Sequence, residues 1–189
     1  MKYILLLSLS CFLGLSAAAQ IIPDSTYNPL IKRHKAIYQN IIGQQLDTLV
    51  TDELIAELNK YRGQKVHINL WSVTCRPCIQ EFPELNELKD HYKDLGINFV
   101  AIAKEEKSRT DRILEINELS WDLLFDGTGL FDDLGVKQYP VNLFINEHGI
   151  ISEVTTGVFM KGEIVDGRTK MSMNNLPYYE MILSAWTKE

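Results

Sequence analysis

The junction at residues 66–92 constrains the fold most, because it joins a predicted strand directly to a long amphipathic helix. Residues 66–71 are rich in large apolar side chains and are predicted to form a strand. After the segment 72–78, apolar residues recur every three or four positions, which gives a helix one buried stripe. This stripe comprises Ile79, Phe82, Leu85, Leu88 and Tyr92. The end of a strand and the start of a helix must therefore meet at 72–78.

Strand and helix patterns continue to alternate on both sides of this junction. Further strands are predicted at 46–50, 97–103 and 123–125, and further helices at 51–61, 110–119 and 175–186. Residues 141–145 and 150–155 are expected to form a hairpin around the turn at 146–149. This order predicts one α/β domain in which a mixed central sheet is flanked by helices.

The composition suits a single domain with a substantial core, since 46% of the residues are hydrophobic and 23% are charged. The formal net charge of −6 is spread along the chain, so the sequence offers no basic stripe and we expect no nucleic-acid partner. Residues 46–189 are expected to fold as this domain, with residues 20–45 as an N-terminal extension.

Residues 1–19 have the layout of a secretory signal peptide. Lys2 supplies a positive start, Ile4–Leu15 is a short apolar run, and Ala17–Ala19 provides small residues before a cleavage at Gln20. The apolar run is too short to span a bilayer comfortably, so we expect cleavage rather than a permanent anchor. We therefore expect an exported protein, in the periplasm.

A lipoprotein signal acylated at Cys11 is a weaker alternative for the same segment. Ser8 stands where such signals prefer a leucine, and Cys11 comes early in the apolar run. After cleavage, Cys75 and Cys78 would be the two cysteines left, and an oxidising compartment would favour their pairing.

Cys75 and Cys78 form a C-x-x-C pair, which could be a zinc site, a structural disulfide or a redox centre. Zinc usually needs four ligands, and the four histidines are scattered without a paired spacing. A disulfide that closes so short a loop would stabilise the fold by only roughly 2 kcal/mol in the chain-entropy model. Redox reactivity therefore explains the spacing better than metal binding or cross-linking does.

The position of the pair at a helix start favours this chemistry. A helix N-terminus carries about half a positive charge and free N–H groups, which stabilise a thiolate. We expect Cys75, which comes first, to be the attacking thiol, and Cys78, one turn further in, to resolve the mixed disulfide. Arg76 adds a positive charge between them or is a solvated bystander, and Pro77 suits the first turn of a helix.

Several segments together resemble one protein family. Residues 71–78, Trp-Ser-Val-Thr-Cys-Arg-Pro-Cys, resemble the active-site segment of thioredoxin-fold proteins. Residues 79–85 are similar to the TlpA/ResA-like branch, which is exported and usually reducing. Residues 135–145 resemble that family's cis-proline loop and following strand, and 146–149 its hairpin turn. The resemblance covers residues 42–189 and implies a thioredoxin-like fold.

The resemblance implies that Pro140 is a cis proline facing the disulfide, where the backbone of Tyr139 could pair with an extended substrate. The alternative is an ordinary trans proline that opens a strand. The residues expected to face the substrate are Trp71, Thr74, Arg76, Pro77 and Tyr139. Thr74 replaces the family's usual aromatic residue and Val141 its usual threonine, so the client protein and the redox potential stay open.

Glu81 is the fourth residue that the resemblance carries into the site. Cys75, Cys78 and Glu81 are spaced three apart, so they share one side of the helix. A carboxylate there could take the proton from Cys78 during resolution, whereas the alternative is a surface glutamate. Asn69 stands where thioredoxin proper has a buried aspartate, and we expect it to be a hydrogen-bonding core residue.

These observations predict a monomeric thiol–disulfide oxidoreductase that exchanges disulfides with protein thiols through Cys75 and Cys78. The resemblance implies a reductant of exported proteins, which would need a membrane-bound thiol partner as electron donor. The reaction requires no organic or metal cofactor. The competing class is a copper-binding protein that holds the metal on the same two cysteines, and a disulfide oxidant or isomerase is a third reading.

Overall fold

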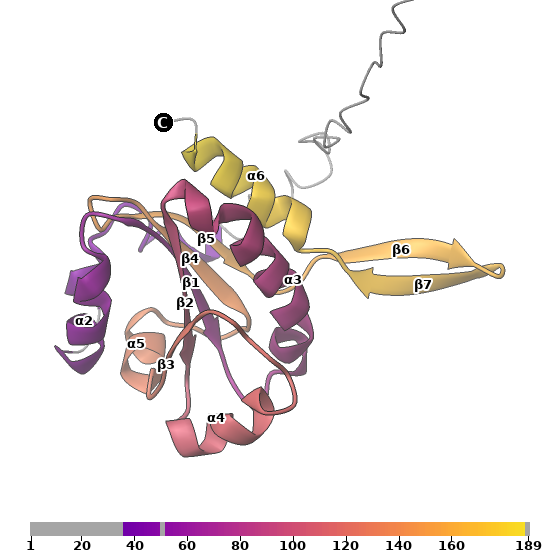
Figure 1. The fold of residues 1–189 in the computed structure, drawn as a ribbon, viewed down its shortest axis with the longest axis horizontal. Helices are drawn as coiled ribbons and strands as arrows, with labels where there is room; N and C mark the ends of the chain where they lie inside the picture. Colours follow the sequence, from indigo (N-terminus) through magenta and orange to yellow (C-terminus); the bar gives the residue numbers. More distant parts are fainter. Residues whose placement is uncertain (1–35, 50–51, 188–189) are drawn as a thin grey trace, which may run out of the picture.

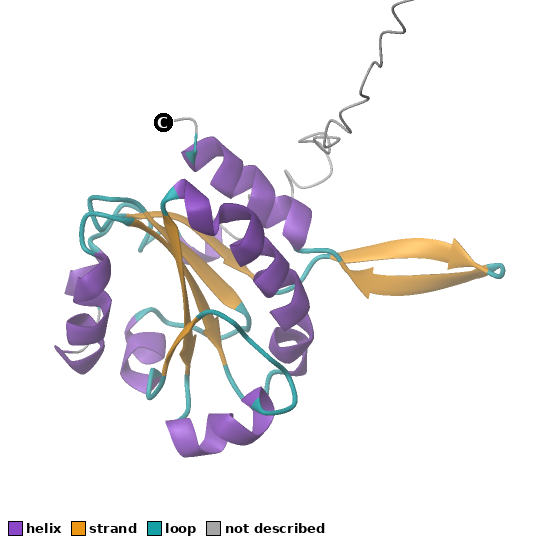
Figure 2. Ribbon diagram, viewed as in Figure 1, coloured by secondary structure: helices purple, strands orange, loops and turns teal. Residues whose placement is uncertain are grey.

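The computed structural model, which describes residues 36–49 and 52–187, is built around a five-stranded sheet in the order β3-β2-β1-β4-β5 (Figure 1, Figure 2). Its strands are β1 Lys65–Trp71, β2 Ile97–Ala103, β3 Asp122–Leu124, β4 Val141–Ile145 and β5 Ile151–Thr156. The pairs β1–β2 and β2–β3 are parallel, whereas β4 runs antiparallel to β1 and to β5. The expected mixed sheet is therefore confirmed.

Helices cover both faces of this sheet (Figure 1). On one face α3, Arg76–Tyr92, lies beside α6, Leu176–Trp186, and α4, Lys107–Leu114, packs at the edge of the same layer. The other face is covered by α2, Asp52–Leu58, the turn of 3-10 helix that follows it, and α5, Thr128–Asp133. None of the helices in the described part of the chain combines the length and apolar character needed to cross a bilayer.

The side chains of β1 alternate between the two faces, as successive residues of a strand must. Those under α2 and α5 are apolar and comprise Val66, Ile68 and Leu70. The side under α3 and α6 receives His67 and Asn69, both fully buried, together with Trp71. A polar patch thus lies inside an otherwise apolar layer.

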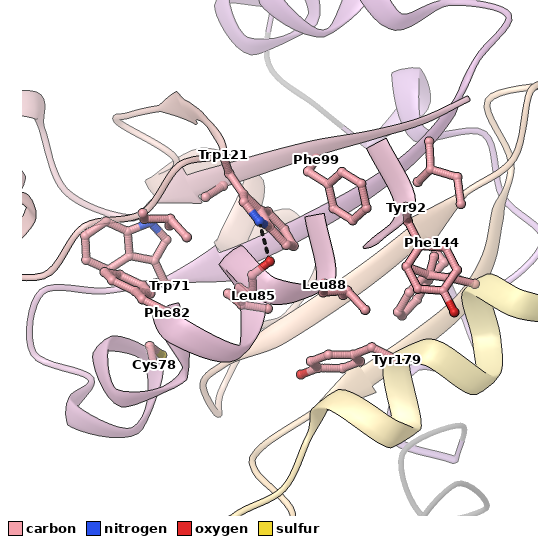
Figure 3. Packing of buried hydrophobic residues seen from close by; sticks show 14 of the residues in the cluster. Trp71, Cys78, Phe82, Leu85, Leu88, Tyr92, Phe99, Trp121, Phe144 and Tyr179 are labelled. Carbon is pink, nitrogen blue, oxygen red and sulfur yellow. Dashed lines mark hydrogen bonds between the residues drawn. The ribbon is translucent and has the colours of Figure 1, made fainter. Parts of the chain in front are cut away.

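Helix α3 forms as the apolar spacing predicts. Phe82, Leu85, Leu88 and Tyr92 are buried, and Ile79 is partly buried. Figure 3 shows this stripe against aromatic side chains of the sheet, and Trp121 Nε1 donates to the Leu85 carbonyl group at 2.9 Å. Burying each large apolar side chain contributes about 1.5–3 kcal/mol. The helix passes into a 3-10 turn that ends at Gly96, whose φ of 76° is readily accessible to glycine.

The sequence-based boundaries were wrong in two places. Instead of a strand at 46–50, Leu46–Thr48 form a 3-10 turn in which the Thr48 hydroxyl group donates to the Gln45 carbonyl group at 2.7 Å. The helix expected at 110–119 lies at Lys107–Leu114, so it begins and ends earlier, and beyond its end the Ile116 N–H donates to the Ile113 carbonyl group at 3.3 Å, a bond of the 3-10 type.

Two elements were not predicted at all: helix α5 and a second, two-stranded sheet. The latter is a hairpin of β6, Met160–Val165, and β7, Arg168–Met173, that projects from the body of the molecule (Figure 1). Its turn places Asp166 and Gly167 at positive φ, the geometry that favours Asp-Gly in tight hairpins. The predicted signal peptide at 1–19 and most of the extension at 20–45 lie outside the described residues.

Candidate active site

Cys75 and Cys78 form a disulfide at the start of α3. Cys75 is the N-cap of this helix, and its Sγ accepts the backbone N–H of Cys78 at 3.2 Å. Cys75 is 8% exposed, whereas Cys78 is fully buried. The outer sulfur therefore lies among the free N–H groups at the positive end of a helix dipole, the position expected of an attacking thiolate.

The loop before Cys75 is held by a residue that sequence reasoning missed. Glu105, two positions after β2, accepts the Ser72 hydroxyl group at 2.7 Å through Oε1 and the Val73 N–H at 3.0 Å through Oε2. The Ser72 carbonyl group in turn accepts the Cys75 N–H at 2.9 Å. Because β1 and β2 are parallel neighbours, residues that follow their carboxyl ends meet at one edge of the sheet, which is the signal that could have identified Glu105.

The Tyr139–Pro140 peptide bond is cis, as the resemblance implied. Pro140 directly precedes β4, and its neighbour Val141 is paired with Leu70. Pro140 is therefore placed at the end of the sheet from which the chain leaves β1 toward Cys75. Pro140 is buried and Tyr139 is half-buried.

The residues predicted to face a substrate do not all reach the surface. Thr74, Arg76 and Pro77 are exposed around the disulfide. Trp71 is fully buried, and its ring meets Phe82 edge-on at 5.1 Å, so the expectation that it faces the substrate was wrong. The cause is strand alternation, which turns this side chain into the layer beneath α3.

Glu81 is fully buried, which rules out the alternative of a surface glutamate. Its Oε1 accepts hydrogen bonds from the Tyr179 hydroxyl group and from the side-chain amide of Asn175. Burial raises the pKa of Glu81 to about 8, although both hydrogen bonds oppose this rise. A carboxyl group with this pKa holds a proton at neutral pH and releases it in mildly alkaline solution.

Asn69 is buried, as expected of a core residue, and its Nδ2 donates to Asn142 Oδ1 at 3.0 Å. Sequence reasoning missed Asn142, Asn175 and Tyr179, which come from β4 and from the start of α6.

A cavity exists at the opposite end of the sheet, beside Val66 and the turn 146–149, and none of the predicted site residues lines it.

A model of the AhpC/TSA family matches residues 44–154. The chain belongs to the AhpC/TSA family. Thiol-disulfide oxidoreductase ResA of Halalkalibacterium halodurans is 32% identical over 120 residues, which cover 61% of this chain and 68% of that protein. The thioredoxin-like protein YneN of Bacillus subtilis is 30% identical over 129 residues, covering 65% and 75% of the two chains.

A solved structure of a thiol:disulfide interchange protein is also similar to this chain. A structure assigned to thiol:disulfide interchange protein DsbE from Chlorobium tepidum superposes with a TM-score of 0.50 at 26% identity, covering 53% of this chain and 72% of that one. Together with the Cys75–Cys78 disulfide, these likenesses show that the chain is a thiol-disulfide oxidoreductase with a thioredoxin-like fold.

Proposed function

We propose that this protein reduces disulfides of exported proteins, with Cys75 as the attacking thiol and Cys78 as the resolving thiol. The observation that carries this assignment is the asymmetry of the pair. The outer sulfur caps α3 and accepts a helix N–H, whereas the inner sulfur is fully buried. A substrate can reach the first sulfur, and the second can attack only the bond that the first has formed.

The exchange proceeds in two displacements. The Cys75 thiolate attacks one sulfur of a substrate disulfide, forming a mixed disulfide and releasing one substrate thiolate. Cys78 then loses its proton and attacks Cys75 Sγ, which breaks the mixed disulfide and releases the second substrate thiolate. Two electrons pass to the substrate, and the Cys75–Cys78 disulfide remains.

Glu81 is the proposed acceptor of the Cys78 proton. It lies one turn beyond Cys78 on the same side of α3, and burial favours its protonated form. The structure is that of the disulfide form, so a pKa of about 8 means that a proton taken during resolution is retained at neutral pH. Glu81 can return this proton to Cys78 when a donor reduces the disulfide again.

Substrate binding is assigned to the surface around the outer sulfur. Thr74, Arg76 and Pro77 are exposed there, and the Tyr139 backbone precedes the cis proline, which itself has no N–H to donate. Pro140 would therefore leave Tyr139 as the nearest backbone partner for an extended substrate segment.

The compartment and partners complete the proposal. Residues 1–19 are assigned as a signal peptide that directs a monomer to the periplasm, where a membrane-bound dithiol would supply electrons. The reductive direction rests on the resemblance of residues 79–85 to the TlpA/ResA-like branch and is tested by the equilibrium potential against glutathione. A value near about −270 mV, as in thioredoxin, supports reduction, and one near about −120 mV favours oxidation.

Insulin reduction by the dithiol form tests the roles of the two sulfurs. Cys75→Ser should abolish the reaction, whereas Cys78→Ser should accumulate a mixed disulfide with the substrate that gel mass analysis detects. The exposed substitution Ser108→Ala is a control that should leave turnover unchanged. A mixed disulfide that forms through Cys78 in Cys75→Ser would reverse the assignment.

A further inference from the structure

The two oxygen atoms of the Glu81 carboxyl group have different surroundings. Oε1 accepts hydrogen bonds from Tyr179 and Asn175. Oε2 is also buried, and within the described residues it accepts no hydrogen bond of normal geometry, although the Asn69 side-chain amide lies close enough to lower the pKa of Glu81. A proton that comes and goes on Oε2 would therefore leave both contacts of Oε1 in place.

The hydrogen bonds behind Oε1 all run in one direction. The Tyr179 hydroxyl oxygen accepts the Asn142 side-chain amide at 2.7 Å, which leaves its own hydrogen for Glu81. Asn142 Oδ1 accepts Asn69 Nδ2 at 3.0 Å and lies 2.9 Å from His67 Nε2. Because a carbonyl oxygen can only accept, His67 must carry its hydrogen on Nε2. Every donor in the chain thus points toward Glu81.

The strand register and ring packing hold this chain rigidly. Asn142 lies directly opposite Asn69 in the β1–β4 pair. The His67 ring stacks on Phe144 with centroids 4.3 Å apart and meets the Tyr179 ring edge-on at 5.4 Å. Strand pairing and ring packing therefore hold the hydrogen-bonded side chains in one arrangement, while His67 Nδ1, Asn69 Oδ1 and Glu81 Oε2 are buried without a hydrogen-bond partner among the described residues.

We propose that Tyr179 and Asn142 are positioning residues for the exchange reaction: they hold Oε1 of Glu81 and leave Oε2 to receive the Cys78 proton. This inference rests on the proposed role of Glu81 as the base. The Cys78 proton moves to Oε2 as the sulfur attacks Cys75 Sγ, and the substrate leaves as a thiolate. The hydrogen bond from Tyr179 favours the carboxylate that must exist before this transfer.

Other titratable groups also face Glu81 from the surrounding elements. Glu84, one turn further along α3, raises the pKa of Glu81, and its Oε2 accepts the backbone N–H groups of Asn175 and Leu176. His67 on β1 reaches Glu81 only through the chain and is neutral, because burial lowers its pKa to about 3. Tyr179 on α6 keeps its proton because burial raises the pKa of its hydroxyl group.

Tyr179→Phe removes the donor and keeps the ring, so it is the direct test. We expect the pKa of Glu81, followed by carbon-13 NMR of its carboxyl group in the disulfide form, to rise by about 1, a tenfold change in the proton equilibrium. The pH–rate profile of mixed-disulfide resolution should move to higher pH by the same amount. Asn142→Leu, which removes the donor behind Tyr179, should move both in the same direction by less.

Tyr178→Phe is the matched control, since it removes the neighbouring buried tyrosine hydroxyl group of α6 and should leave both measurements unchanged. In a Glu81→Gln background, Tyr179→Phe should no longer move the rate profile. If Tyr179→Phe leaves the pKa of Glu81 and the profile unchanged while Glu81→Gln alters the profile, the inference alone is overturned. If Glu81→Gln itself leaves the profile unchanged, the proposed role of Glu81 fails and the inference falls with it.

Discussion

The hydroxyl group of Tyr179 donates a hydrogen bond to the carboxyl group of Glu81, although the two residues are 98 positions apart in the sequence. This contact joins α6 to α3 inside the layer on one face of the sheet, and neither side chain reaches solvent. A carboxyl group in this place is costly to ionise, because burial removes it from water. The stability of the fold should therefore depend on the protonation of Glu81.

Glu81→Gln is predicted to remove a loss of stability that the wild-type protein suffers as pH rises. The pKa of Glu81 is raised from 4.5 to about 8, so below pH 4.5 the group is neutral in both the folded and unfolded states. Between pH 4.5 and 8 the unfolded state ionises first, and the free energy of unfolding falls by about 1.4 kcal/mol for each pKa unit, a few kcal/mol in total. Urea unfolding of the disulfide form at pH 5 and pH 8 measures this difference.

The control for this measurement is Glu87→Gln, an exposed substitution on the same helix that should keep the wild-type pH dependence. Between pH 5 and pH 8, Glu81→Gln should lose less unfolding free energy than the wild-type protein or Glu87→Gln does. Parallel losses in all three proteins would contradict the assignment of a raised pKa to Glu81.

His67→Gln is predicted to reduce the acid sensitivity of the fold. Burial lowers the pKa of His67 to about 3, so the folded state resists protonation while the unfolded state takes up a proton near pH 6.5. The contribution of neutral His67 to the free energy of unfolding is thus fully present above pH 6.5 and is lost as the pH falls toward 3. Glutamine can donate from its own Nε2 to Asn142 without titrating.

The free energies of unfolding at pH 7 and pH 4.5 measure how stability changes with pH, and the exposed substitution His148→Gln is the matched control. The difference between the two pH values should shrink in His67→Gln and stay at the wild-type value in His148→Gln. An unchanged slope in His67→Gln would show that His67 does not titrate on unfolding.

The sequence predicted those parts of the site that lie close together along the chain. The Cys75–Cys78 pair at a strand–helix junction and the Asn146–Gly149 hairpin turn follow from local patterns, and Asn69 was identified as a core hydrogen-bonding residue. The partners of Glu81 could not be found this way, because only tertiary packing brings Asn175 and Tyr179 to α3 from 94 and 98 positions away.

Two errors, the substrate-facing role given to Trp71 and the missed β6–β7 hairpin, could have been avoided from signals in the sequence. Strand alternation places Trp71 on the same face as Asn69, which argues for burial rather than substrate contact. The Asp166–Gly167 pair is a hairpin signal inside the segment left unassigned at 160–174. By contrast, the short apolar run at 46–50 is ambiguous, since a run of this length does not discriminate a strand from a turn of helix.

Glu105→Ala is predicted to destabilise the loop that presents Cys75. The Val73 N–H would lose its acceptor, and leaving such a donor unpaired costs about 1–3 kcal/mol, whereas the Ser72 hydroxyl group could still donate to Thr74 Oγ1 at 2.9 Å. The free energy of unfolding in urea measures the loss. Glu106→Ala is the matched control, because among the described residues this neighbouring carboxylate accepts only the exposed Ser108 hydroxyl group, and its removal should change stability by less than about 0.5 kcal/mol. Equal losses in the two variants would contradict the role given to Glu105.

Deleting the β6–β7 hairpin is predicted to leave the thioredoxin-like domain folded. The ends of the hairpin lie together, since the Asn174 N–H donates to the Phe159 carbonyl group at 2.9 Å, so a short glycine linker can replace residues 160–173. No residue of that segment belongs to either buried apolar cluster. The midpoint of thermal unfolding should therefore stay within about 4 °C of the wild-type value. By contrast, Phe159→Ala removes a buried ring whose centroid lies 4.6 Å from that of Tyr178, and it should lower the free energy of unfolding by about 3–5 kcal/mol. If the deletion destabilises the protein as much as this substitution does, the hairpin supports the core.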